Sequence, residues 1–309
     1  MTIVQLEYIV AVDTYKSFVK AAEKCFVTQP TLSMQVQKLE ENLNIKIFDR
    51  TRQPIMPTEI GLEVIAQARK VLQESYKINE IINERKDEIS GELKIGVIPT
   101  IAPFLLPKVI GKFMEKYPKV KLYISELTTE NIIERLKNGL LDCGILATPL
   151  DEPTIVERPV YYENFVSYIS ETSPLFEKKA LEFSDLNIDE VWLLNEGHCL
   201  RNQVLNICKH KKSEGQHLEY NTGSIETLIR MVDLNQGMTI LPELSLQDFS
   251  IEQLDKVRYF KSPQPSREIS IVTHANFIKK RTIDVLEAEI LSSVPKSMKS
   301  KTQKEVIAI

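Results

Sequence analysis

The stretch that decides the fold runs from Ser17 to Arg50: SFVKAAEKCFVTQPTLSMQVQKLEENLNIKIFDR. Ser17 is placed to cap a helix that ends at about Cys25, and Thr28 is placed to cap the next helix. Pro30 falls in the first turn of that second helix, where its missing N–H does no harm. The segment therefore predicts two helices joined by a tight connection.

Regular patterns continue on both sides of this stretch. Upstream, Leu6, Ile9 and Val10 form the apolar face of a first short helix. Downstream, residues 45–48 and 55–56 flank a turn and predict a two-stranded wing. Three helices followed by a wing are typical of a winged helix-turn-helix, whose recognition helix enters the major groove of DNA.

The third helix and the wing carry the candidate DNA contacts. Hydroxyl and amide side chains bond base edges or phosphates, whereas arginines and lysines hold flanking phosphates. The candidates are Thr28, Gln29, Pro30, Thr31, Ser33, Gln35, Lys38, Arg50 and Arg52. Residues 1–60 hold seven basic and seven acidic side chains, so a small helical protein-binding module remains the alternative.

A single long helix is predicted to follow the wing. Between Thr58 and Ile89 the chain contains one glycine and no proline, which allows a helix of roughly 30 residues and ~45 Å. Small or apolar residues and one serine recur every seven positions in two series, Val64, Val71 and Ile78, and Ala68, Ser75, Ile82 and Ile89. This seam predicts a two-stranded coiled coil and a dimer, with a helix packed on its own domain as the alternative.

After Gly91 the pattern changes to strands that alternate with helices. Strands are predicted at 93–98, 120–126 and 143–147, with a helix after each of the first two. This order predicts a parallel sheet with right-handed crossovers. Further strands are predicted at 165–169, 190–194, 238–241 and 268–272, followed by a helix at 279–291 and a disordered tail at 293–309.

Composition limits the class of protein. Of 309 residues, 43% are hydrophobic and 27% are charged, which is an ordinary globular mixture with room for about two domains. No apolar run approaches the ~20 residues of a membrane span, and the N-terminus lacks a signal-peptide pattern. We therefore expect a soluble, cytoplasmic protein with no membrane partner. Because the net charge is −4, any nucleic-acid binding must rest on a local surface.

Two of the four cysteines, Cys199 and Cys208, lie at the ends of an apolar-periodic segment. If that segment is one helix, its rise separates their Cα atoms by ~13 Å, whereas a disulfide requires ~4.4–6.8 Å. A bridge would therefore unwind the segment and convert an oxidant into a conformational signal. In that case Cys199, near a helix N-terminus and beside His198 and Arg201, would be the reactive thiol and Cys208 the resolving one.

Two other interpretations of this pair stay open. Both thiols could be inert core residues, as Cys25 and Cys143 are expected to be. The pair could also bind a metal with the help of His198 and His210, although the spacing fits no usual zinc pattern.

Residues 17–61 resemble the LysR-type transcriptional regulators. The resemblance rests on SFxxAA at 17–22, TQPTLS at 28–33, LE at 39–40, FDR at 48–50 and TxxG at 58–61. It implies a winged helix-turn-helix, a linker helix and a two-lobed effector domain like the periplasmic binding proteins. It also implies homodimers that pair into homotetramers.

The rest of the chain resembles the members of this family that sense hydrogen peroxide. The matching motifs are GVIPT at 96–100, LLP at 105–107, LDC at 141–143, SxETL at 224–228 and GMTILP at 237–242, together with the segment around the cysteine pair. The resemblance implies that Cys199 reacts with peroxide and that Cys208 closes a disulfide. It also implies a peroxide pocket formed by Thr100, Thr129, His198 and Arg267, although both threonines could instead cap helices.

The expected fold is α/β with an α-helical head. A winged helix-turn-helix is expected at 1–58, a dimerisation helix at 59–89 and an effector domain at 90–292. The first lobe of that domain would comprise about 91–162 and 268–292, and the second about 163–267.

The expected function is that of a transcriptional activator, not an enzyme, with no cofactor and no metal. Its expected partners are double-stranded operator DNA, RNA polymerase and a glutaredoxin- or thioredoxin-type reductant. Two alternatives remain: a LysR-type regulator of a small organic effector with incidental cysteines, and a thiol peroxidase built on the same fold.

Overall fold

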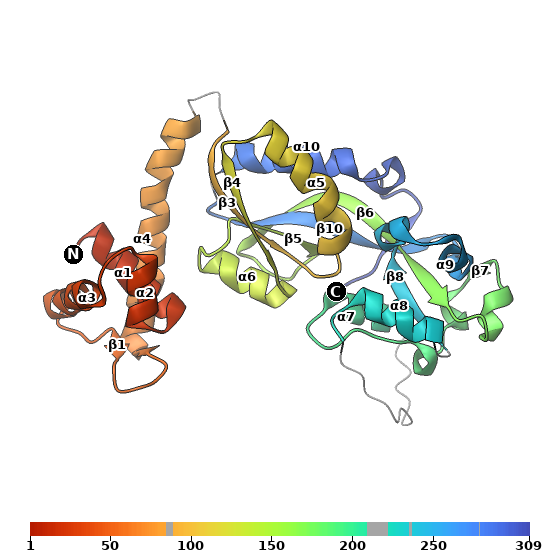
Figure 1. Cartoon of the computed structure of the whole chain (residues 1–309), viewed down its shortest axis with the longest axis horizontal. Helices are drawn as coiled ribbons and strands as arrows, with labels where there is room; N and C mark the ends of the chain where they lie inside the picture. The colour runs from red at the N-terminus through yellow and green to blue at the C-terminus, as the bar shows by residue number, and fades with distance from the viewer. Residues whose placement is uncertain (85–88, 209–221, 235–236, 278) are drawn as a thin grey trace. The chain divides into compact units, whose positions relative to one another are not determined.

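The computed structural model describes residues 1–84, 89–208, 222–234, 237–277 and 279–309 (Figure 1). The chain divides into two compact units, Met1–Asp87 and Glu88–Ile309. Within the described ranges, no helix is both long enough and apolar enough to cross a membrane.

The first unit is a winged helix-turn-helix. It consists of α1 (Ile3–Tyr15), α2 (Phe18–Lys24), α3 (Gln29–Leu43) and the antiparallel strands β1 (Phe48–Asp49) and β2 (Met56–Pro57). The Ser17 and Thr28 hydroxyls accept from the backbone N–H groups of Lys20 and Thr31, so both predicted caps are confirmed.

The long helix α4 (Glu59–Glu84) packs its first half on its own unit. Three residues of this half, Ile65, Ala68 and Leu72, are buried in the core of the first unit. Ala68 belongs to the predicted dimer seam, so its burial favours the alternative interpretation for this half. Ile78, further along, is 62% exposed and free to meet a second helix. Residues 85–88 of the predicted helix lie outside the described residues.

The second unit is built on a nine-stranded mixed sheet. Its strands are β3 (Gly91–Val97), β4 (Val120–Glu126), β5 (Cys143–Thr148), β6 (Ile155–Ile169), β7 (Ala180–Leu181), β8 (Met238–Pro242), β9 (Val257–Phe260), β10 (Gln264–His274) and β11 (Lys304–Val306). The order is β4-β3-β5-β10-β6-β9-β7, with β11 beside β10 and β8 beside β6. The pairs β3–β4 and β3–β5 are parallel as predicted, whereas β10 runs antiparallel to β5 and β6.

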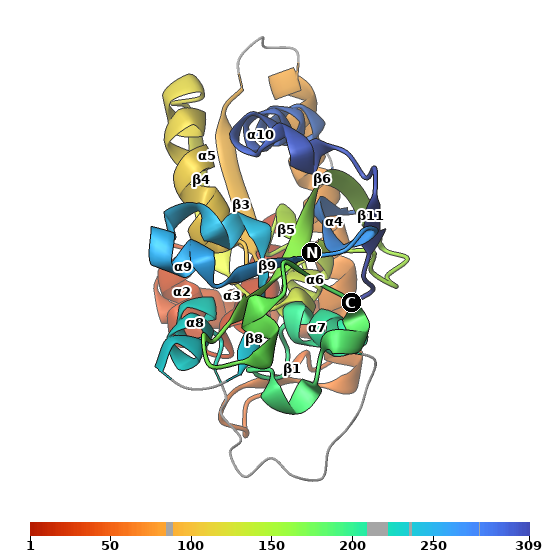
Figure 2. The ribbon, with the colours of Figure 1, turned by 90° about the vertical axis from the view of Figure 1, so that its right-hand side faces the viewer.

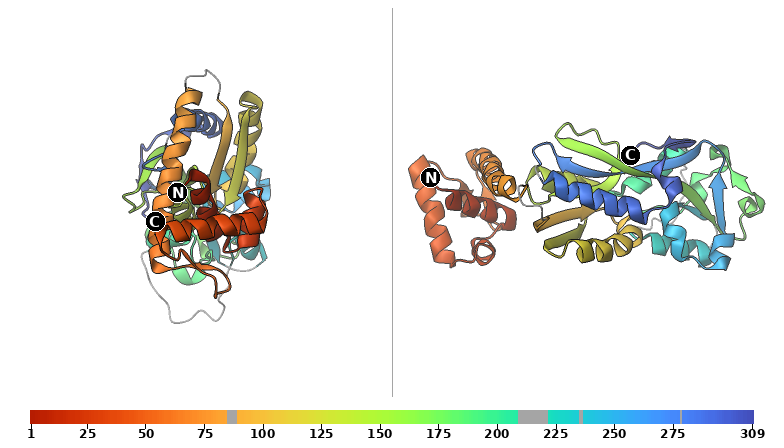
Figure 3. Two further views of the ribbon diagram at one scale, coloured as in Figure 1. Left: turned by 90° about the vertical axis from the view of Figure 1, so that its left-hand side faces the viewer. Right: turned by 90° about the horizontal axis from the view of Figure 1, so that it is seen from above.

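Within the described residues, six α-helices accompany this sheet. They are α5 (Ala102–Lys116), α6 (Thr129–Lys137), α7 (Cys199–Ile207), α8 (Ile225–Leu234), α9 (Ile251–Asp255) and α10 (Lys280–Ser293). Helices α5 and α10 lie side by side on one face of the sheet, and α6 covers the other face (Figures 1 and 3).

Two hydrophobic cores form in this unit. The first gathers β3, β4 and β5 with α5, α6 and α10, and the second gathers β8 with α7 and α8. Strand β6 serves both cores, since Tyr161 packs in the first and Phe165 in the second. The lobe boundaries expected at 162/163 and 267/268 therefore fall inside β6 and β10, where the sheet is continuous.

One predicted strand is wrong. Residues 190–194 do not form a strand, because the chain passes from a 3-10 helix (Ile188–Glu190) into a single bridge between Val191 and Met238. Val191 and Leu194 are buried in the second core. The apolar residues of this run thus indicate that the segment is buried, and an irregular backbone can bury them as well as a strand can.

The predicted disordered tail is also wrong. Residues 304–306 form β11, which pairs in parallel with residues 264–266 of β10. Ile307 is buried in the second core, and its N–H donates to the Ser266 carbonyl at 2.8 Å. The prediction failed because the segment is mostly polar, whereas its few apolar residues include Met298 and Ile307, which are buried.

This tail is bound to α7. The side-chain amide of Gln203 donates to the carbonyl of Ile307, and that of Asn206 donates to the carbonyl of Ala308, both at 3.1 Å. Figure 2 shows the end of the chain beside α7. The position of α7 therefore depends on residues about a hundred positions away in the sequence.

We predict that Ile307→Ala lowers the free energy of unfolding by about 2–4 kcal/mol, because it empties a buried site in the second core. Urea unfolding at pH 7 measures the change, and Glu305→Ala, an exposed side chain on the same strand, is the control. An unfolding free energy equal to that of the unaltered protein would contradict the docking of the tail.

Candidate functional site

Helix α7 carries one cysteine at each end. Cys199 is its first residue and Cys208 is its C-cap. The two side chains are only 5% and 7% exposed, and Cys199 belongs to the first hydrophobic core whereas Cys208 belongs to the second. The helical rise separates their Cα atoms by ~13 Å, as the sequence predicts for one continuous helix.

A buried arginine approaches Cys199 from strand β10. Arg267 is 1% exposed, and its Nη1 donates to Oγ1 of Thr100 at 2.9 Å while Nη2 donates to the Thr100 carbonyl at 3.1 Å. Its Nε donates to Oε2 of Glu163 at 2.9 Å. The guanidinium is therefore held on two sides by groups that are themselves buried.

Opposing effects act on the Cys199 thiol. Burial raises its pKa, because a thiolate loses hydration in the protein interior. The Arg267 cation, the Thr129 side chain and the backbone N–H groups at the start of α7 lower the pKa, but burial outweighs them. The resting thiol is therefore protonated at neutral pH, although it lies at the N-terminus of a helix.

Thr100 and Thr129 do not act as helix caps. The N-cap of α6 is Thr128, and that of α5 is Ile101. Among the described residues, the buried hydroxyl oxygen of Thr129 has no partner at hydrogen-bonding distance and angle. The Thr129 side chain nevertheless lies close enough to Cys199 to lower the pKa of that thiol. A buried hydroxyl without a partner is costly, so this atom marks the place where a small polar molecule would be stabilised.

The cations expected from the neighbouring sequence do not act on Cys199. Burial lowers the pKa of His198, so its imidazole is neutral at pH 7, and its ring lies against Gly223. Arg201 donates instead to the carbonyl of Leu194 at 2.8 Å. The local cation is Arg267, which only the family resemblance indicates.

Sequence reasoning misses Glu163, the partner of Arg267. Its side chain is fully buried, and Glu163 and Arg267 are directly opposite residues on β6 and β10. A buried arginine requires a counter-charge, which is the only signal that a sequence could offer. Which of the 43 acidic residues supplies that charge depends on strand register.

The structure tests in part the two other interpretations of the cysteines, as inert core residues and as metal ligands. All four cysteines are free, and no group of three or more His, Cys, Asp or Glu side chains in the described ranges could hold a metal ion. His210, one of the four candidate ligands, lies outside those ranges. Cys143 is buried in β5 and burial raises its pKa, whereas Cys25 is only partly buried at the end of α2.

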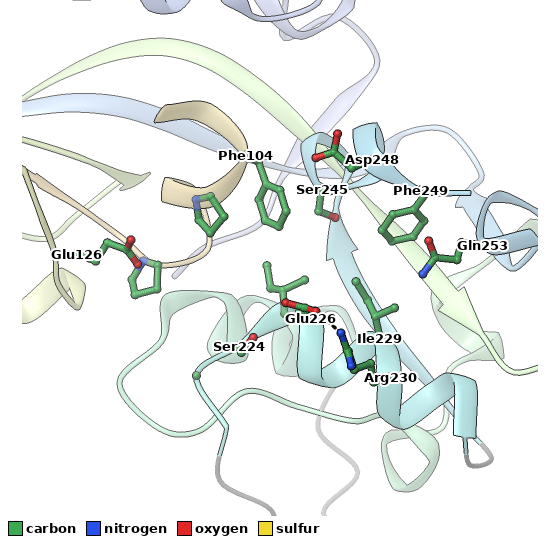
Figure 4. Close-up of a pocket in the computed structure, with 14 residues that line it drawn as sticks. Phe104, Glu126, Ser224, Glu226, Ile229, Arg230, Ser245, Asp248, Phe249 and Gln253 are labelled. Carbon is green, nitrogen blue, oxygen red and sulfur yellow. Dashed lines mark hydrogen bonds and ion pairs between the residues drawn. The ribbon is translucent and has the colours of Figure 1, made fainter. Parts of the chain in front are cut away.

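A separate cavity of about 490 Å³ opens between the start of α5 and the start of α8 (Figure 4). Phe104 and Phe249 give it apolar walls, and Glu126 and Glu226 add acidic groups. Glu226 is paired with Arg230 at 2.6 Å. The cavity is of a size that accepts a small metabolite, and no predicted residue of the peroxide pocket lines it.

The recognition helix α3 leaves only some of its candidate DNA contacts free. Gln29, Pro30, Thr31 and Lys38 are exposed, whereas the Gln35 amide oxygen accepts from Gln5 of α1. Thr28 is the N-cap of the helix. The first turn of α3 is therefore the part best able to reach base edges.

The predicted wing contacts have structural partners. The Arg50 guanidinium pairs with buried Glu40 at 3.3 Å, donates to Ser33 and lies over the ring of Phe18. Arg52 pairs with Asp49 but stays 70% exposed. Arg50 thus holds the wing on α3, and Arg52 is the freer of the two arginines.

Comparisons with known proteins place these features in context. Residues 3–62 match the bacterial regulatory helix-turn-helix protein of the lysR family, and residues 86–290 match the LysR substrate binding domain. The chain is 37% identical over 272 residues to the hydrogen peroxide-inducible genes activator of Haemophilus influenzae, covering 88% of this chain and 90% of that protein. It is 34% identical over 274 residues to the DNA-binding transcriptional dual regulator OxyR of Escherichia coli, with coverage of 88% and 89%.

The fold is similar to that of a solved structure of a full-length OxyR variant from Pseudomonas aeruginosa. The TM-score is 0.79 at 34% sequence identity, and the match covers 95% of this chain and 99% of the other.

We predict that Cys208 makes the protein less stable at alkaline pH. Burial raises the pKa of the Cys208 thiol to about 11, so the unfolded chain releases this proton at lower pH than the folded chain does. The contribution is complete below about pH 8.5 and is lost as the pH rises through 11. Urea midpoints from pH 8 to 11 should therefore fall less steeply for Cys208→Ala than for the unaltered protein, and parallel curves would contradict the prediction.

Proposed function

Because this chain belongs to the LysR family of bacterial transcriptional regulators, we propose that it binds operator DNA and senses hydrogen peroxide through reversible Cys199–Cys208 disulfide formation. The observation that supports peroxide sensing is the environment of Cys199. This buried thiol lies near the Arg267 cation and near the buried Thr129 hydroxyl, which has no hydrogen-bond partner among the described residues. Two relatives named for peroxide or OxyR, each aligned over 88% of this chain, support it.

The chemistry consumes one peroxide for two thiols. The sulfur of Cys199 attacks one oxygen of hydrogen peroxide, so an S–O bond forms, the O–O bond breaks, and the departing hydroxide takes the thiol proton to become water. The sulfur of Cys208 then attacks the sulfur of the sulfenic acid, so an S–S bond forms, the S–O bond breaks, and the departing hydroxide takes the Cys208 proton to become a second water. Two thiols and one peroxide give one disulfide and two waters.

The pocket residues have distinct roles in the first step. Arg267 stabilises the thiolate as it forms and the hydroxide as it leaves, because both carry negative charge in a buried site. The Thr129 and Thr100 hydroxyls hydrogen-bond the peroxide, and His198 closes one side of the pocket as a neutral ring. A thiol that is protonated at rest reacts when peroxide occupies the site, and at neutral pH it reacts only slowly with reagents that lack such contacts.

Closing the disulfide changes the packing of the second unit. A bridge brings the two Cα atoms from ~13 Å to ~4.4–6.8 Å, which requires α7 to unwind. The ten-residue disulfide loop contributes ~2–3 kcal/mol on the loop-closure estimate, enough to exchange two packed states of similar energy. The sensor is therefore a two-state device in which oxidation selects the state with α7 unwound.

The remaining parts follow the family pattern. Residues 1–58 bind DNA, 59–89 pair two chains, and 90–292 sense peroxide; dimers join into tetramers. The oxidised form changes the spacing of DNA half-sites and the contact with RNA polymerase, and it acts as an activator. A cytoplasmic glutaredoxin- or thioredoxin-type reductant reduces the disulfide back to two thiols. The reaction is therefore stoichiometric signalling and not enzymatic turnover.

A second candidate function is regulation by a small organic effector. The cavity between α5 and α8 favours it, since its volume and mixed lining suit a metabolite. In that case the cysteines are incidental and the protein responds to peroxide no differently from its Cys199→Ser variant.

We predict that one equivalent of peroxide lowers the number of titratable thiols from four to two. Mass spectrometry of a tryptic digest should find a peptide that links positions 199 and 208. Cys199→Ser should abolish the link, whereas Cys208→Ser should leave a sulfenic acid at position 199 that dimedone traps.

Cys25→Ser is the control for this experiment, because it removes one thiol without affecting the link. Four remaining thiols in the unaltered protein, or a response to peroxide on promoter DNA by Cys199→Ser, would favour the organic effector. Rapid continuous consumption of peroxide with thioredoxin would instead favour a thiol peroxidase.

We also predict different effects from two substitutions on α3. Gln29→Ala should cost about 1–3 kcal/mol on the preferred DNA sequence and little on other DNA, because an amide reads base edges. Lys38→Ala should weaken binding to all sequences and reduce the salt dependence by about one phosphate contact. Electrophoretic shifts with DNA selected by the unaltered protein measure both effects.

The control is Lys112→Ala, an exposed lysine of α5 in the second unit, which should bind like the unaltered protein. Unchanged affinity for both α3 variants would favour a protein-binding module.

A further inference from the structure

Glu163 and Arg267 form a fully buried ion pair where the two cores of the second unit meet. They are Cα partners on the antiparallel strands β6 and β10, and their exposed fractions are 0% and 1%. The Oε2 atom of Glu163 lies 2.9 Å from Nε and 2.8 Å from Nη2 of Arg267. The sheet register therefore fixes the pair, because neither residue can move without disturbing the ladder.

Resting on the function proposed above, we propose that Glu163 is a positioning residue that sets the reactivity of Cys199. It does so by limiting the positive charge of Arg267 that reaches the sulfur, while Thr100 and the strand register keep the guanidinium in place.

The contacts of Glu163 leave its carboxylate no freedom to turn. Its Oε1 atom accepts from the backbone N–H of Leu244 at 2.7 Å, at the start of a 3-10 helix (Glu243–Asp248). Its Oε2 atom is occupied by Arg267. Because Thr100 holds the far side of the guanidinium, the cation is clamped between two elements and stays aligned with the pocket.

This clamp leaves one part of the guanidinium free. Nη1 donates one N–H to the Thr100 hydroxyl, and the described part of the chain offers no acceptor to its second N–H. A guanidinium whose other edge is fixed by a carboxylate presents this group in a constant direction. One charged N–H of Arg267 is therefore left without an acceptor among the described residues.

The carboxylate also weakens the field of the arginine. An isolated buried cation would stabilise a nearby thiolate strongly, whereas an adjacent carboxylate converts the charge into a pair with a weaker effect at a distance. Arg267 lowers the pKa of Cys199, yet burial still raises it overall. We therefore expect Glu163 to add to the effect of burial, which holds the pKa of the Cys199 thiol above its ordinary value.

Other ionisable groups face this pair from neighbouring elements. Tyr161 on β6 has its pKa raised by burial and by Glu163, and burial raises the pKa of Glu243 in the 3-10 helix. Lys304 on β11 donates to the carbonyl of Tyr162, and its pKa is lowered by burial. None of these groups hydrogen-bonds Arg267 among the described residues, so the charge of Glu163 is the one that acts on the arginine directly.

The test measures alkylation of Cys199 against pH in the reduced full-length protein. Iodoacetamide reacts with the thiolate, so the pH midpoint of the rate at position 199, followed by mass spectrometry, reports the pKa of that thiol. Glu163→Gln keeps the shape and the acceptor for Leu244 but removes the charge. We expect its midpoint to fall by about one pH unit, with alkylation at pH 7 several-fold faster.

Two further variants separate charge from structure. Glu163→Asp keeps the charge and should keep the midpoint near that of the unaltered protein. Glu289→Gln makes the same chemical change at a 4% exposed carboxylate that pairs with Lys116 on α5, so its midpoint should not move. A folded Glu163→Gln protein with an unshifted midpoint, or one that is slower at every pH, would overturn the proposal.

If Glu163→Gln does not fold, the double variant Glu163→Gln with Arg267→Met removes both charges together. Its midpoint should rise above that of the unaltered protein, because the pair as a whole favours the thiolate. An equal or lower midpoint would overturn the proposal. Alkylation requires no peroxide, so this result is distinct from the proposed function, which fails if peroxide leaves Cys199 of the unaltered protein unoxidised.

Discussion

The second unit depends on the ion pair between Glu163 and Arg267. Burying two charges costs several kcal/mol each, and the cost is offset only when partners satisfy both ions. Here the sheet register places the two residues opposite each other, and Thr100 and Leu244 each add a hydrogen bond to one member of the pair. Because these partners come from the start of α5, from the two long strands and from a 3-10 helix, one pair ties together the elements that surround Cys199.

Local patterns predict the parts of this molecule that are locally determined. Ser17 and Thr28 cap their helices because capping needs only a hydroxyl and the next few N–H groups. The parallel strands around Gly96 and Gly144 follow from apolar runs separated by helices. Contacts between distant segments lack such a signal. Glu163 lies opposite Arg267 because of the strand register, and the polar sequence around Ile307 does not predict that this residue is buried in the second core.

The candidate site shows the same division. The sequence leaves open whether the segment between the two cysteines is one helix. The structure shows that it is, and a helix of this residue count places the two thiols far apart. The protonation of Cys199 depends instead on burial and on Arg267, and neither is encoded near position 199. The family resemblance supplies Thr100, Thr129 and Arg267, whereas the neighbouring His198 and Arg201, which local chemistry favours, face other groups.

The distribution of the two sulfurs over two cores has a consequence for the duration of a signal. If the two sulfurs join, at least one core loses a sulfur atom that fills it. The oxidised state is therefore less well packed than the reduced state for as long as the bond lasts. If that bond were then reduced, restoring the packing of both cores would favour the helical form of α7. If the proposed disulfide forms, the packing that opposes it also favours the return to the reduced state.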